Sequence, residues 1–85
     1  MKKIHFNGNK NIIHAHLPKW REARGLTQGE LAARMQVLGV NIDQQMISKI
    51  EHNSRIVTDY ELACLCKILK VTEKDLMEDI FADEA

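Results

Sequence analysis

Hydrophobic residues recur along the chain at the three- and four-residue spacings of amphipathic helices rather than in the alternation of strands. The first series predicts a helix over residues 14–25 and is built on three apolar residues, Ile13, Leu17 and Trp20. Pro18 falls in its first turn, where proline is tolerated, and Gly25 marks its end. We expect Trp20 to pack in the core rather than to stack on a ligand.

Three further helices are predicted by capping boxes, in which a threonine precedes an acidic residue by three positions. The hydroxyl and the carboxylate of such a box each accept a hydrogen bond from a free amide at the helix start. We therefore expect helices that follow Thr27, run from Thr58 to Lys70, and cover residues 73–81.

A short helix over residues 44–52 is predicted to begin after Asp43, a favourable N-cap. Its apolar residues fall on one side: Met46, Ile47 and Ile50. The opposite side carries amides, a hydroxyl, an ammonium and an imidazole, from Gln44, Gln45, Ser48, Lys49 and His52. Glutamine pairs well with adenine and lysine with guanine, so this side is suited to reading base edges. The alternative is an ordinary solvated helix face.

Five helices in 85 residues indicate an all-α domain with one modest core. We expect a flexible N-terminal arm over residues 1–12, the helical domain over residues 13–81, and an acidic tail over residues 82–85. No apolar stretch is long enough to cross a bilayer, and the polar start does not resemble a secretory signal. These features predict a cytoplasmic protein with no membrane association.

The formal net charge is zero, but the charges are unevenly distributed. Through Ile56 there are nine basic and four acidic residues, whereas from Val57 onward there are three basic and eight acidic residues. A molecule divided in this way can present a basic face to phosphates and direct its acidic face away. The same acidic half could instead bind a basic protein partner.

Few residues suggest enzymatic or metal chemistry. Cys64 and Cys66 are two positions apart and therefore point to different sides of a helix, which prevents a bridge between them. His14 and His16 diverge in the same way, and a pair of His5 and His52 is a weak basis for a metal site. With no nucleophile and base set and no glycine-rich phosphate loop, we expect neither an enzyme nor a cofactor or metal.

Two segments together resemble the phage-repressor-like, or xenobiotic-response-element, helix-turn-helix family. They are Gly-Leu-Thr-Gln-Gly-Glu-Leu-Ala at residues 25–32 and Ile-Ser-Lys-Ile-Glu at residues 47–51, with Thr-Asp-Tyr-Glu-Leu following at residues 58–62. The resemblance extends over about residues 13–81. It implies a compact five-helix lambda-repressor-like domain that binds double-stranded DNA and regulates transcription as a repressor.

The resemblance also implies roles for individual residues. Base contacts would come from the helix over residues 44–52, through Gln44, Gln45, Ser48 and Lys49. Phosphate contacts would come from Gln28 with neighbouring Thr27, from Arg55 in the loop after that helix, and from Lys19. Arg21 and Glu51 would form a structural ion pair. One departure is that the connection from Leu31 to Glu51 is about five residues longer than usual, through either a longer helix or a bulging connector.

A single domain of this kind covers little DNA surface, so useful affinity implies a homodimer on a two-fold site. The predicted last helix carries two apolar stripes, one of Leu76 with Ile80 and one of Met77 with Phe81. One stripe would close the core and the other would meet the partner, which makes Met77, Ile80 and Phe81 the interface residues. The alternative is that both stripes join one core.

The competing function is a protein-interaction module of the same fold, such as an antitoxin or bridging factor.

Overall fold

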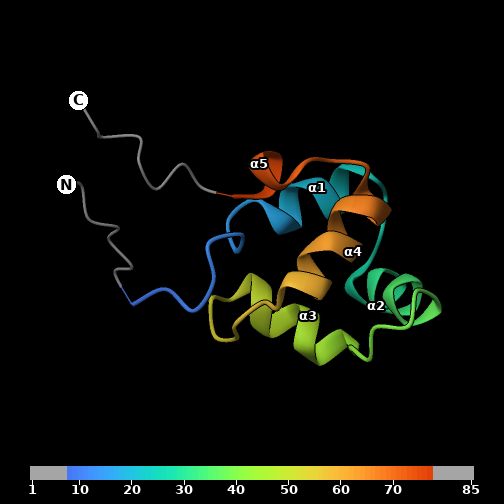
Figure 1. Ribbon diagram of the computed structural model, residues 1–85, viewed down its shortest axis with the longest axis horizontal. Helices are drawn as coiled ribbons and strands as arrows, with labels where there is room; N and C mark the ends of the chain where they lie inside the picture. The colour runs from blue at the N-terminus through green and yellow to red at the C-terminus, as the bar shows by residue number, and fades with distance from the viewer. Residues whose placement is uncertain (1–7, 78–85) are drawn as a thin grey trace.

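Helix caps determine where most of the helices begin in the computed structural model, which describes residues 8–77 (Figure 1). Complete capping boxes precede three helices, α2 (Gln28–Val37), α4 (Asp59–Leu69) and α5 (Glu73–Leu76). Asp43 caps α3 (Gln44–Glu51) by accepting the Met46 N–H at 2.8 Å. Together with α1 (Leu17–Ala23), residues 8–77 contain five helices and no strand, which confirms the all-α prediction.

The predicted start of the first helix was wrong. Regular helix begins at Leu17, and the preceding residues form a turn in which the N–H groups of His16 and Leu17 both donate to the carbonyl of Ile13, at 3.1 and 2.9 Å. Pro18 has no N–H to donate to the carbonyl of His14, so the helical ladder cannot extend back to that residue. The helix ends at Ala23, two residues before Gly25, whose φ of +69° reverses the chain.

The predicted last helix is also shorter than expected within the part of the chain that the structure describes. It ends at Leu76 because Met77 has an extended backbone, with φ −85° and ψ 141°. Met77 helps to line an apolar hollow together with Ile13, Val57 and Leu62. The remainder of the predicted helix, residues 78–81, lies outside the described residues.

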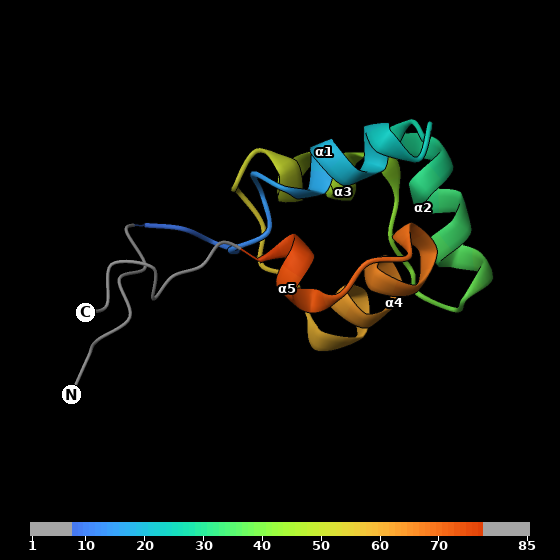
Figure 2. The ribbon, with the colours of Figure 1, turned by 90° about the horizontal axis from the view of Figure 1, so that it is seen from above.

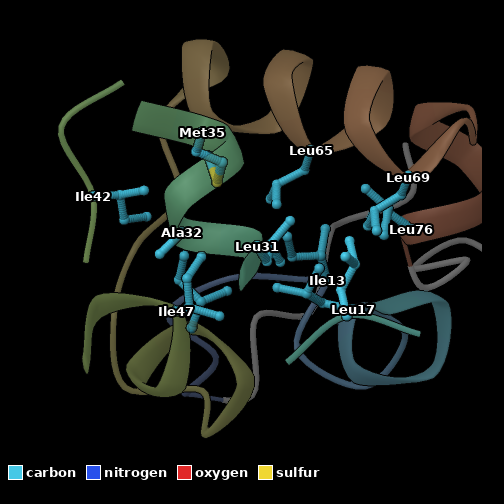
Figure 3. Packing of buried hydrophobic residues seen from close by; sticks show 12 residues of the cluster. Ile13, Leu17, Leu31, Ala32, Met35, Ile42, Ile47, Leu65, Leu69 and Leu76 are labelled. Carbon is cyan, nitrogen blue, oxygen red and sulfur yellow. The ribbon is translucent and has the colours of Figure 1, made fainter. Parts of the chain in front are cut away.

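The helices pack around one core that every helix enters (Figures 2 and 3). Helix α2 lies against both α3 and α4, and Figure 3 shows Leu31 of α2 between Ile47 of α3 and Leu65 of α4. The buried hydrophobic residues are Ile13, Leu17, Leu26, Leu31, Ala32, Met35, Ile42, Ile47, Ile50, Leu65, Leu69 and Leu76. No helix within residues 8–77 has the length and apolar character needed to span a membrane.

The long connection between α2 and α3 combines a turn with an extended segment. Gly39, with φ +90°, reverses the chain after α2, and the Val40 N–H returns to donate to the carbonyl of Met35 at 3.0 Å. The Gln36 side chain then donates to the carbonyl of Ile42 at 2.8 Å, and the Ile42 side chain is fully buried. The additional residues are therefore held against the domain, and α3 begins at a defined position.

The segment just before the predicted domain start is bound to the loop that follows α3. The buried side chain of Asn11 donates to the carbonyls of Ile50 and Arg55, at 3.0 and 2.9 Å. Asn53, which adopts a left-handed φ of 59°, accepts the Lys10 N–H at 2.8 Å and donates to Asn9 at 2.7 Å. Residues 9–11 therefore form part of the folded unit, while the division at residue 13 stays a prediction.

The loop between α3 and α4 is held by an ion pair. Both terminal nitrogens of Arg55 donate to the Glu61 carboxylate, at 2.8 and 2.9 Å, and the Thr58 N–H donates to the same carboxylate at 3.0 Å. Glu61 is only 6% exposed. The Arg55 guanidinium is the main cause of a lowered pKa for Glu61, with the Thr58 hydrogen bonds also lowering it and burial opposing them.

This lowered pKa predicts acid-sensitive folding. Because the folded-state pKa of Glu61 lies below its ordinary value of 4.5, the ionised carboxylate stabilises the fold above that pH. The stabilisation is lost as the pH falls through the lowered pKa. Replacing the charged hydrogen-bond acceptor in Glu61→Gln should cost about 2 kcal/mol at pH 7 and flatten the decline of stability below pH 4.5.

Urea unfolding at several pH values measures this effect. Glu22→Gln, which removes an exposed carboxylate from α1, is the matched control and should keep both the stability and the pH profile of the unmodified protein. Equal stability of the Glu61→Gln and Glu22→Gln variants at pH 7 would contradict the assigned role of the ion pair.

Candidate nucleic-acid interface

Helix α3 has one face in the core and the opposite face in solvent. Ile47 and Ile50 are fully buried, and Met46 packs against the edge of the core. Successive residues of a helix are rotated by about 100°, so the side chains on the other face must point outward. These are Gln44, Gln45, Lys49 and the C-cap His52, all exposed, with Ser48 half-buried between them. They form the recognition ridge, and Figure 1 shows that α3, which carries it, lies at an edge of the domain.

The end of the ridge is also fixed. The Ser54 N–H and hydroxyl both donate to the carbonyl of Lys49, at 2.9 and 3.1 Å, which closes the helix with a tight loop. The imidazole Nδ1 of His52 lies 2.7 Å from the carbonyl oxygen of Ser48 and therefore donates to it. His52 thus keeps its ring beside Ser48, and its other nitrogen remains available at the exposed surface.

Glu51 joins α3 to the two helices before it. Arg21 of α1 donates to both carboxylate oxygens of Glu51, at 2.7 and 3.1 Å, so the expected Arg21–Glu51 ion pair is present. The hydrogen bond from Arg21 to Glu51 is the main reason that the pKa of Arg21 is raised. Gln28 of α2 donates its amide to Glu51 at 2.9 Å. One carboxylate therefore orients α1, α2 and α3 relative to one another.

The first turn of α2 lies beside the first turn of α3. A Cβ placed on Gly29 would lie 3.3 Å from the Gln44 amide oxygen, so a larger residue at position 29 would require the Gln44 side chain to shift slightly. Thr27 and Gln28 flank this contact; Thr27 is exposed and Gln28 is half-buried. The structure thus brings together the predicted phosphate-contacting residues of α2 and the first predicted base-contacting residue of α3.

The other two predicted phosphate-contacting residues have partners elsewhere. The terminal nitrogens of Arg55 are bound to Glu61, as described above. Lys19 lies with its ammonium 5.5 Å from the centre of the Trp20 ring, and the Trp20 indole donates to the Asp75 carbonyl at 3.1 Å. Lys19 is therefore at the contact of α1 with α5 and not on the recognition ridge. Contacts of Arg55 and Lys19 with phosphate stay predictions.

Of the predicted interface residues, the structure describes only Met77. It is half-buried and packs against the edge of the core. Ile80 and Phe81 lie outside the described residues. The homodimer therefore stays a prediction.

The structural contribution of Asn11 and Asn53 was missed in the sequence. The Asn11 side chain donates to the carbonyls of Ile50 and Arg55, and the Asn53 side chain accepts the Lys10 N–H, so together they join the N-terminal segment to the loop after α3. Asparagine does favour the left-handed backbone that Asn53 adopts, so its position after a helix was a usable signal. The partners of Asn11 are about 40 residues away, and no local pattern points to them.

Comparison with known proteins agrees with this geometry. A family model described as helix-turn-helix matches residues 19–76, which is more than half of the chain and includes all of α2, α3, α4 and α5. No curated protein shows significant similarity to the chain. Because the match covers α3 and the helices that hold it, the chain belongs to the helix-turn-helix family of the phage-repressor and xenobiotic-response-element type. This is a family of DNA-binding regulators.

Proposed function

We propose that this helix-turn-helix protein represses transcription by binding a specific duplex sequence with α3 in the major groove. The observation that carries the proposal is the recognition ridge: Gln45 and Lys49 are exposed on a helix whose opposite face is fully buried. A helix anchored in this way can present its side chains to base edges without losing contact with its own core. Occupation of the site would exclude the transcription machinery.

Sequence would be read by the side chains of the ridge. Gln44 and Gln45 each offer an amide that can bond an adenine edge in two places, and Lys49 offers an ammonium suited to guanine. Ser48 and Lys49 follow one helical turn later on the same side of α3, so the four side chains can enter one groove together. The residues proposed to contact bases are Gln44, Gln45, Ser48 and Lys49.

The start of α2 would position the domain on the backbone. Gln28 uses one amide proton for Glu51, and the second proton remains for a phosphate oxygen. The Thr27 hydroxyl accepts the Glu30 N–H at 3.0 Å and still has its own proton to donate. Glu51 would thus orient Gln28 toward phosphate while it holds α3 in the groove. A homodimer would place two such surfaces on a two-fold-related site.

Removal of a base-reading side chain should reduce specific binding selectively. Selection from random duplex DNA first gives the preferred site. Lys49→Ala and Gln45→Ala should then each weaken binding to that site by about 1–3 kcal/mol and affect a random duplex much less. Fluorescence anisotropy with both duplexes measures the two affinities at one salt concentration.

The matched control for this experiment is Lys74→Ala, which removes an exposed lysine from α5, away from the ridge. This variant should bind the selected site as the unmodified protein does. Equal losses for Lys49→Ala on the selected and random duplexes would show that Lys49 contacts phosphate and does not read bases.

The salt dependence of binding separates two roles for Arg55. Because its guanidinium is bound to Glu61, we expect Arg55→Met to destabilise the fold by about 3 kcal/mol by leaving Glu61 buried without its partner. The slope of log affinity against log salt should stay unchanged at a temperature where the variant is folded. A slope lower by about one ion would instead establish the phosphate contact implied by the family resemblance.

A further inference from the structure

An apolar groove with a basic rim lies on a side of the domain that the proposed DNA contact does not use. It has a volume of about 340 Å³ and lies between the C-terminal ends of α2 and α4, which pack together. Its lining residues are Arg34, Val37, Leu38, Lys67, Ile68 and Lys70. Val37 is 86% exposed and Leu38 40% exposed, so two large aliphatic side chains face solvent here.

The core does not require these exposed side chains. Met35 and Ile42, on either side of them in the chain, are fully buried and already fill the core at this end. Val37 ends α2 and Leu38 is its C-cap, at the start of the connection that the family resemblance indicates is longer than usual. Neighbouring exposed aliphatic residues that the core does not use are typical of an interaction site.

The charges around the groove indicate the chemistry of its partner. Three cations line it, and the same set of lining residues contains no carboxylate. An extended segment with aliphatic or aromatic side chains between acidic residues would bury Val37 and Leu38 and neutralise the rim. Charge complementarity of this kind gives an interface its specificity and orientation.

The chain itself contains such a segment at residues 78–84, Glu-Asp-Ile-Phe-Ala-Asp-Glu, which lies outside the described residues. Ile80 and Phe81 have two acidic residues before them and two after Ala82. They come three and four residues after Met77, within about 14 Å of it even in a fully extended chain. Figures 1 and 2 show α5 and the C-terminal end of α2, which contributes Val37 to the groove, toward opposite ends of the domain, and this favours a groove on another molecule.

We propose that the groove between α2 and α4 binds residues 78–84 of a second copy of this chain. Ile80 and Phe81 would cover Val37 and Leu38, and the acidic residues would pair with Arg34, Lys67 and Lys70. Exchange between two copies related by a two-fold axis is reciprocal, so it closes as a dimer. This proposal deepens the homodimer of the proposed function by naming its interface. It is tested without DNA, so its failure would be distinguishable from a failure of DNA binding.

Charge reversal on either side of the interface tests the proposal. The groove variant is Arg34→Glu with Lys67→Glu, and the tail variant is Asp79→Lys with Asp83→Lys, both in the full chain. Sedimentation equilibrium should show a dimer of the unmodified protein with a micromolar dissociation constant. Each variant should raise that constant by at least about tenfold, because it places like charges against one another.

An equimolar mixture of the two variants gives the sharpest result. The acidic groove of one then faces the basic tail of the other, and the basic groove faces the acidic tail, so both contacts become attractive. We expect the mixture to form heterodimers at concentrations where each variant alone dimerises at least about tenfold more weakly than the unmodified protein. The control is Lys10→Glu with Lys74→Glu, the same charge change at two exposed sites away from the groove, which should dimerise normally.

Circular dichroism should show the same helix content in all of these proteins. An unmodified protein that stays monomeric to about 1 mM would overturn the proposal. So would a groove variant that dimerises like the control, since the interface would then lie elsewhere, and so would a mixture that fails to associate.

Discussion

The burial of one face of α3 is the constraint on which both the fold and the site depend. Eight residues form too short a helix to persist alone in water, so its stability comes from tertiary packing. Ile47 and Ile50 provide that packing by entering the core completely. A rotation of α3 by one residue, about 100°, would pull these side chains from the core and turn polar residues toward it. The core therefore selects the face that Gln45 and Lys49 present.

Two carboxylates, each bound by an arginine, hold the helix at this rotation. Glu51 receives Arg21 from α1 and Gln28 from α2, and Glu61 receives Arg55 from the loop that follows α3. The desolvation of such pairs offsets much of their attraction, so their net contribution to stability is modest, whereas removal of one partner is costly. Their main effect is geometric, since a two-pronged contact permits only one arrangement of the segments that it joins.

The parts of the structure that follow from local sequence were predictable, and those that depend on distant partners were not. The capping boxes at Thr27, Thr58 and Thr72 located three helix starts, because the cap and its partner are three residues apart. The two faces of α3 followed from periodicity alone. The docking of Asn11 and the pairing of Arg55 with Glu61 bridge irregular loops, which no periodicity describes. The local pattern likewise did not predict that α5 ends at Leu76.

The connection between α2 and α3 fixes the start of the recognition helix through its own contacts. Gly39 turns the chain at the surface, and the buried side chain of Ile42 fixes the residue before Asp43, where α3 is capped. The position of α3 is therefore set by a core contact and not by the number of residues that precede it. Gln28 still reaches Glu51 at 2.9 Å across the α2–α3 contact. Because the ridge and the groove beside Leu38 share no side chain, one can change without distorting the other.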